Sequence, residues 1–190
     1  MFKRGFKTFC EQTAEAHRRQ RRLHVWEPLS ATVIAAEMKA RIVTPNELPT
    51  LPADVRQRLL TDHSEVWSAI TISATPPLIV YNPMHKPARQ NSDLMHELAH
   101  LLLEHVPLKV YIDPNTRVAL RHHDKDQEEQ ANWLSACLLL PRAALERIMQ
   151  LHLSDSEACA RYNVSLDMLR FRMGTSGVSI QYQRRQKFSR

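Results

Sequence analysis

Apolar residues recur along most of this chain at the three- and four-residue spacing of amphipathic helices. Two runs, 68–72 and 78–81, are instead typical of strands and are joined by a hairpin-length connection, and 40–43 is a third short strand. Helices before, between and after a few strands indicate an α+β fold rather than βαβ repeats. The predicted helices are 7–22, 28–38, 54–61, 91–105, 125–139, 141–151, 154–162 and 165–173, with 106–124 irregular.

The strongest chemical signal is the sequence His96-Glu97-Leu98-Ala99-His100, inside the helix predicted over 91–105. Positions i and i+4 lie on one face of a helix, so His96 and His100 can offer two imidazole nitrogens to one metal ion. Glu97 lies about 100° further around the helix, where it can reach a water molecule on that metal. This is half of the site that a zinc hydrolase requires.

The start of this helix is predicted from its polar residues. Asn91 and Ser92 are preferred N-cap types, and Asp93 is favourable in a first turn. We therefore expect the helix to begin near residue 91.

A third metal ligand has to come from elsewhere in the chain. The extended metzincin motif is excluded because Leu103 and Val106 stand where it requires Gly and His. His105 follows His100 by five residues and is expected to point away from the metal face. Further ligand types occur in the polar segment before the next helix: His122, His123, Asp124 and Asp126.

The helix predicted over 125–139 offers a better ligand. Glu128 and Asn132 are four residues apart and share a helix face, so the carboxylate can bind metal while the amide orients a ligand histidine. Glu129 lies about 100° away from Glu128. Without the histidine motif, Glu128 and Glu129 would be interpreted as a solvated charge pair.

Four stretches together resemble the ImmA/IrrE family of zinc metallopeptidases, in order over roughly residues 28–180. The stretches are Ile79-Val-Tyr-Asn-Pro83, Arg89 to His100, Glu128-Glu-Gln-Ala-Asn132 and Leu138-Leu-Leu-Pro141. The resemblance implies a zincin-like fold, with a small β-sheet packed on several helices and two or three short helices at the C-terminus.

The resemblance also implies a function. It implies one zinc ion held by His96, His100 and Glu128, as in gluzincins, with Glu97 as the general base; the third ligand is assigned from the Glu-x-x-Ala-Asn pattern, and Glu129 stays an alternative. It further implies cleavage or inactivation of a DNA-binding repressor of the helix-turn-helix type, often encoded beside a mobile element or a stress operon.

Peptide hydrolysis at such a site requires one more donor for the oxyanion. Tyr81, His122 and His123 are the candidates, and the sequence does not choose among them. An exposed strand edge near 78–81 could also hold an extended peptide by backbone hydrogen bonds. The alternative function is a non-proteolytic regulator, or a toxin–antitoxin-type interaction protein, with a structural metal site. Glu97 argues against it, because a structural site requires ligands but no base.

Length and composition narrow the classes further. With 190 residues, 43% of them hydrophobic, we expect one domain over 1–190, comprising an N-terminal helical region (1–48), a metal-site core (49–150) and a C-terminal helical segment with a basic tail (151–190). Only 3 glycines argue against a phosphate-binding loop. Three widely spaced cysteines predict a reducing, cytoplasmic location. No apolar run approaches the ~20 residues that span a membrane.

The net charge of +6 is concentrated in two basic runs, 18–22 and 184–187. Such runs are usually solvated, and the functional alternative is weak contact with nucleic acid or with an acidic partner. Residues 156–173 also have the layout of a helix-turn-helix, with Asn163 in the turn and Arg170 and Arg172 on the second helix. We favour a pair of core helices there, because such a turn requires only common residue types.

Overall fold

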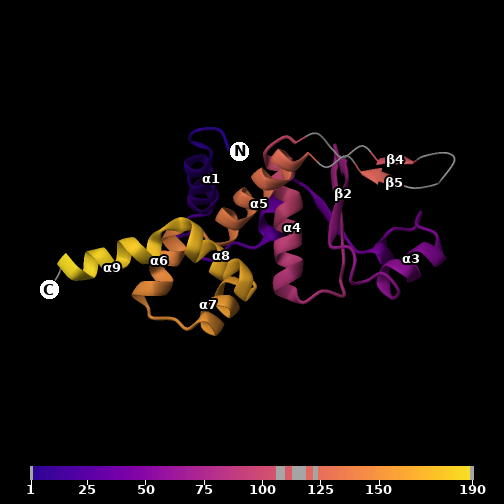
Figure 1. Cartoon of the computed structure of the whole chain (residues 1–190). Coiled ribbons are helices and arrows are strands. Elements are labelled where there is room, and N and C mark those ends of the chain that lie inside the picture. The colour runs from indigo at the N-terminus through magenta and orange to yellow at the C-terminus, as the bar shows by residue number, and fades with distance from the viewer. Residues whose placement is uncertain (1, 106–109, 113–118, 122–123, 189–190) are drawn as a thin grey trace.

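The computed structural model describes residues 2–105, 110–112, 119–121 and 124–188, and its fold is α+β, as predicted (Figure 1). The helices in these ranges are α1 Phe6–Gln20, α2 Ala31–Glu37, α3 Ala53–Leu60, α4 Pro87–Leu102, α5 Lys125–Leu139, α6 Arg142–Gln150, α7 Asp155–Tyr162, α8 Leu166–Ser176 and α9 Val178–Phe188, with a 3-10 turn at Pro45–Glu47. The strands are β1 Arg41–Val43, β2 Ala69–Ala74, β3 Pro77–Tyr81, β4 Val110–Ile112 and β5 Ala119–Arg121.

Helix α4 lies at the centre of the molecule (Figure 1). It packs against α5, α2 and strands β2 and β3. The apolar stripe of α4 explains this position, because Met95, Leu98 and Ala99 are fully buried and meet Leu134 and Leu138 of α5 in the core. Each buried leucine side chain contributes about 1.5–3 kcal/mol relative to an exposed one. The packing of α4 on α5 is therefore what fixes the two helices that carry the candidate metal ligands.

The three-stranded sheet has the order β1-β3-β2. Strand β3 is central: it pairs with β1 in parallel and with β2 in antiparallel fashion. The prediction that an open strand edge near 78–81 holds a peptide is therefore wrong, because both sides of β3 are occupied by neighbouring strands. The edge strand beside α4 is β2.

Helix α4 begins four residues earlier than predicted, at Pro87. Proline is favourable at a first helical position because it has no N–H to leave unpaired. Asn91 therefore lies inside the helix and does not cap it. Its side-chain oxygen accepts a hydrogen bond from the Ala31 N–H at 2.9 Å, and its amide donates to the Asn163 carbonyl at 3.0 Å. Asn91 thus joins α4 to α2 and to the turn between α7 and α8.

The C-terminal end of α5 is covered by two buried arginines. Arg18 of α1 donates to the Leu138 carbonyl at 2.8 Å, and Arg172 of α8 donates to the Leu140 carbonyl at 2.9 Å. The last carbonyls of a helix lack partners inside the helix, so these guanidinium groups satisfy acceptors that would otherwise be buried unpaired. Arg172 also forms an ion pair with Glu11 of α1 at 2.5 Å.

Two parts of this fold were not predicted as such. The segment 106–124, predicted to be irregular, contains the antiparallel pair β4–β5, and the basic tail contains α9. Within the described ranges, the structure has no helix both apolar and long enough to traverse a bilayer.

Candidate metal centre

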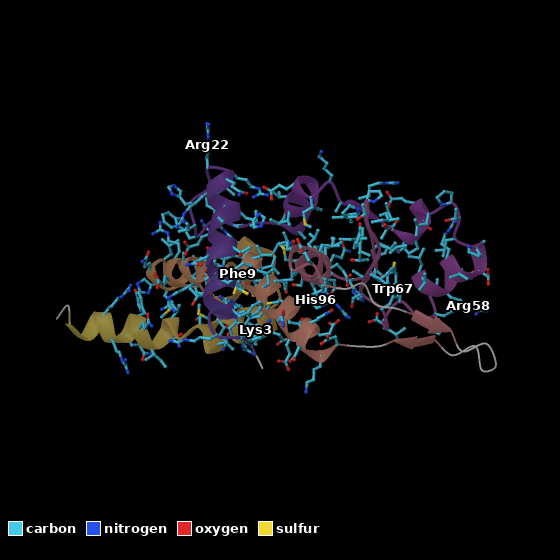
Figure 2. The ribbon with its side chains drawn as sticks, turned by 90° about the horizontal axis from the view of Figure 1, so that it is seen from above. Lys3, Phe9, Arg22, Arg58, Trp67 and His96 are labelled. Carbon is cyan, nitrogen blue, oxygen red and sulfur yellow. The ribbon has the colours of Figure 1, made fainter. Side chains whose placement is uncertain are left out.

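Two helices bring together the three residues predicted as metal ligands. His96 and His100 come from successive turns of α4, and Glu128 comes from the first turn of α5. The Nε2 atoms of the two histidines lie 3.0 Å apart. The Glu128 carboxylate lies 3.3 Å from Nε2 of His96 and 3.5 Å from Nε2 of His100. Figure 2 shows His96 between the part of the molecule that carries Phe9 and the part that carries Trp67.

This spacing suits a zinc ion. Ligand atoms at about 2.0–2.2 Å from one tetrahedral zinc ion lie roughly 3.3–3.5 Å from one another. The two histidine nitrogens and the carboxylate oxygen all lie within 4.8 Å of one another. All three residues are only partly buried. Two imidazoles and one carboxylate are also the ligand set of many catalytic zinc sites, which keep a fourth position open.

The protonation of His100 favours metal binding. Burial lowers the pKa of His100 to about 4, the charge of a protonated His96 acts in the same direction, and Glu128 opposes the shift. At neutral pH the His100 ring is therefore neutral, and a neutral imidazole is the form that binds a metal ion.

Glu97 points to strand β2. Its Oε2 atom accepts two hydrogen bonds from Thr71, one from the backbone N–H at 2.9 Å and one from the hydroxyl at 2.7 Å. In the described part of the chain its Oε1 atom has no hydrogen bond, so one oxygen is anchored while the other remains available. Burial raises the pKa of the Glu97 carboxyl above its usual value, and the Thr71 hydrogen bonds oppose this rise.

A β-bulge lies directly after Thr71. Thr71 pairs with Ile79 and Ser73 pairs with Leu78, so Ile72 is the extra residue of β2. Bulges bend a strand and redirect its side chains, and they are common beside active sites. Thr71 is not predictable from the sequence, because it lies 26 residues before Glu97 and only the sheet brings the two together.

The other sequence candidates lie outside the ligand group. Glu129 is exposed. Asn132 is exposed too, and its side-chain amide has no hydrogen bond to the residues that the structure describes, so its role beside a histidine stays a prediction. Asp124 caps α5 by accepting from the backbone N–H groups of Asp126 and Gln127, and Asp126 is exposed.

Of the candidate oxyanion donors, only Tyr81 lies in the part of the chain that the structure describes. Tyr81 ends β3 and packs against the core. His122 and His123 fall outside the described residues. His105, expected to point away from the metal, does not belong to the ligand group. It contacts Nδ1 of His100, the ring nitrogen that does not face the ligand group.

Among the residues that the structure describes, no strand pairs with the outer edge of β2, and this free edge faces the same side as Glu97. The Ser68 carbonyl accepts from the Asn82 N–H at 2.8 Å, which fixes the alternation of the antiparallel pair. The backbone groups of Ala69 and Thr71 therefore project away from β3, as the hydrogen bond from the Thr71 N–H to Glu97 shows. An extended peptide added at this edge would lie alongside the candidate base.

The basic run 18–22 is largely occupied by contacts within the protein. Arg18 is fully buried, Arg19 pairs with Glu15 at 2.6 Å and Arg21 pairs with Glu37. Arg22 is exposed and projects from the end of α1 (Figure 2). The run is therefore not a continuous cationic surface.

The helix-turn-helix layout is also explained by packing. Asn163 adopts the left-handed conformation between α7 and α8 (φ 48°), as expected of such a turn. Arg172, which would have to face DNA, is buried against α5, so that of the two arginines on this helix Arg170 alone is exposed.

The chain matches a protein-family model over more than half of its length. The family described as peptidase M78, IrrE N-terminal-like domain, matches residues 43–173. This range contains the metal-ligand group, Glu97 and Thr71. No curated protein matches the chain.

Proposed function

The chain belongs to the peptidase M78 family, and on this premise we propose that it is a zinc-dependent endopeptidase that inactivates a DNA-binding repressor. Membership of this family supports a metallopeptidase-type function. The zinc ion, the endopeptidase activity and the repressor are our proposal. We also propose a cytoplasmic location, since Cys10, Cys137 and Cys159 are all free thiols.

The observation that carries this proposal is the position of Glu97. It lies next to a ligand group of two histidines and one glutamate, yet it does not belong to that group. Its carboxylate is instead held by Thr71 on the adjacent strand. A structural metal site requires no such group, whereas a hydrolase requires a base beside the metal.

The residues divide the reaction between them. His96, His100 and Glu128 would hold zinc, which when bound polarises the scissile carbonyl and activates a water molecule for attack. Glu97 takes the proton from the attacking water on its Oε1 atom and passes it to the leaving amine nitrogen. Thr71 keeps the other oxygen of Glu97 fixed, so that the transfer requires no rotation of the carboxylate.

The free edge of β2 is the proposed binding site for the substrate backbone. Ala69 offers an N–H and a carbonyl there, and Thr71 offers a carbonyl, because its N–H is used by Glu97. Backbone pairing of this kind recognises an extended segment but does not discriminate between side chains. We therefore propose that specificity comes from docking a folded repressor whose linker reaches this edge, and that generic substrates such as casein are cut poorly.

The test is cleavage of a helix-turn-helix repressor encoded beside the gene for this protein, which is the substrate that we propose. The purified proteins are incubated with and without a zinc chelator, and the fragments are mapped by mass spectrometry. We expect one or a few cuts in a linker, abolished by the chelator and restored by added zinc. Inactivation of the repressor without fragments would show that the protein acts by binding, which contradicts the peptidase proposal.

Replacing Thr71 by Val should impair the base without affecting the metal. The variant keeps the β-branched shape and loses the hydroxyl donor, and a hydrogen bond to a charged group contributes about 1.5–3 kcal/mol. We expect kcat to fall by roughly 10-fold or more. In the wild type the hydroxyl hydrogen bond of Thr71 lowers the pKa of Glu97. The pKa of Glu97 should therefore rise in the variant, and the acidic limb of the pH–rate profile should move to higher pH.

The controls for this variant are zinc content and Thr71→Ser. Zinc binding should match the wild type, and Ser, which keeps the hydroxyl, should restore both kcat and the pH profile. An unshifted profile in Thr71→Val would mean that the hydroxyl does not act on Glu97 during the reaction.

The alternative regulator function predicts specific DNA binding, and the buried arginines argue against it. We expect only unspecific binding, with dissociation constants on the order of 10⁻⁴–10⁻⁶ M at physiological salt. Titration of the chain's own promoter and of a random duplex over a range of salt concentrations measures this. A preference of several orders of magnitude for the promoter would favour the regulator.

A further inference from the structure

His105 contacts the back of one candidate metal ligand. Its Nδ1 atom lies 3.0 Å from Nδ1 of His100, and the two rings meet edge to face at 72°. The other ring nitrogen of His105, Nε2, lies 3.4 Å from the Oε1 atom of Gln130 on α5. A row of three side chains thus runs from the metal-facing ring of His100 to Gln130, two residues beyond Glu128.

The end of α4 brings His105 to this position. Glu104 adopts the left-handed conformation with φ 53°. The Glu104 N–H bonds to the Leu101 carbonyl at 3.1 Å, and the His105 N–H bonds to the His100 carbonyl at 3.0 Å. This pair of bonds is the Schellman motif, which reverses the chain over the last helical turn. It explains why a residue five positions beyond His100 lies against it, which helical spacing alone does not predict.

Only one arrangement of protons along this row leaves His100 able to bind a metal. His100 faces the ligand group through Nε2, so Nε2 must carry the lone pair and Nδ1 the proton. The Nδ1–H of His100 then donates to Nδ1 of His105, and the Nε2–H of His105 donates to Gln130. Every nitrogen in the row then has a complementary partner.

We propose that His105 is a positioning residue, which accepts a hydrogen bond from the Nδ1–H of His100 and so fixes both the tautomer and the ring orientation that metal binding requires. The proposal rests on the zinc site of the proposed function. The loss of such a partner of a metal-ligating histidine typically weakens metal affinity 10–100-fold. Gln130 supports the row by accepting from His105.

The experiment compares zinc affinities by competition with a chelating dye. His105→Phe keeps a ring of similar size but has no acceptor, and we expect its affinity to fall about 10–100-fold. His105→Asn places an amide oxygen near the position of Nδ1, and we expect it to remain within about 3-fold of the wild type. His63→Phe, at an exposed histidine outside the row, should leave the affinity unchanged.

Two further measurements separate positioning from a purely structural role. The melting temperature of the metal-free protein should be similar in the wild type and His105→Phe, whereas the rise on adding a fixed zinc concentration should be smaller in the variant. The visible spectrum of the cobalt-substituted protein should change in His105→Phe and recover in His105→Asn.

The outcomes are distinct. Wild-type affinity in His105→Phe overturns the proposal while leaving the zinc site intact. Equal losses in His105→Asn and His105→Phe overturn it too, because they would show that the imidazole itself is required. A wild-type protein that binds no zinc overturns both this proposal and the proposed function.

Discussion

Glu97→Gln should cut the proposed repressor substrate about 10²–10⁴-fold more slowly than the wild type, at an unchanged zinc content. The amide cannot take a proton from water, but its oxygen can still accept both hydrogen bonds from Thr71. Zinc should remain because Glu97 lies outside the ligand group. Single-turnover cleavage, with zinc measured in the same sample, gives both quantities.

Stability provides an internal control for this variant. Burial raises the pKa of Glu97 in the folded protein, so folding disfavours its ionised form, and this cost applies once the pH exceeds the unfolded pKa. Gln carries no charge, so the metal-free variant should melt at or above the wild-type temperature at pH 7. Glu129→Gln, an equivalent change at an exposed neighbour of the candidate ligand Glu128, should leave cleavage unaffected. Fragments formed at the wild-type rate by Glu97→Gln would remove Glu97 from the mechanism.

Glu128→Ala should lose zinc, and Glu129→Ala should keep it. The Glu128 carboxylate lies 3.3 Å from His96 and 3.5 Å from His100 at their Nε2 atoms, whereas Glu129 is exposed. Loss of the hydrogen-bond partner of a metal ligand weakens metal affinity by at most roughly 100-fold. Removal of the ligand itself should weaken zinc affinity more than this. Elemental analysis of protein purified without added metal, followed by a chelator competition, measures the effect.

The same variants can be compared by thermal denaturation. A ligand at 100 times its dissociation constant stabilises the folded state by about 2.7 kcal/mol, so zinc should raise the melting temperature of Glu129→Ala and not that of Glu128→Ala. Loss of zinc from Glu129→Ala alone would place the third ligand one residue later in α5.

The features that the sequence predicted correctly depend on residues that are close together in the chain. Helix α5 has the predicted bounds, 125–139, because its apolar spacing is regular and Asp124 caps its first turn. His96 and His100 were also predicted correctly to lie together on α4. Residues i and i+4 share a helix face regardless of how the rest of the chain folds.

What the sequence did not predict depends on contacts between distant segments. Asn91 is an acceptable cap by type, but its partners lie 60 and 72 residues away, and they hold it inside α4. Strands β4 and β5 have three residues each, too few for an alternating pattern to emerge. His105 was assigned from helical spacing, which no longer applies once Glu104 turns left-handed.

The buried Arg18 has a consequence for where this protein can be divided. The family match begins at residue 43, after α1, yet α1 supplies the guanidinium that satisfies the Leu138 carbonyl and buries Cys10 and Ala14 in the common core. A fragment cut at the homology boundary would expose the part of α5 that packs against α1 and leave that carbonyl without its donor. The smallest autonomous folding unit therefore extends well beyond the homologous segment, and any transplant or truncation of the peptidase must carry α1 with it.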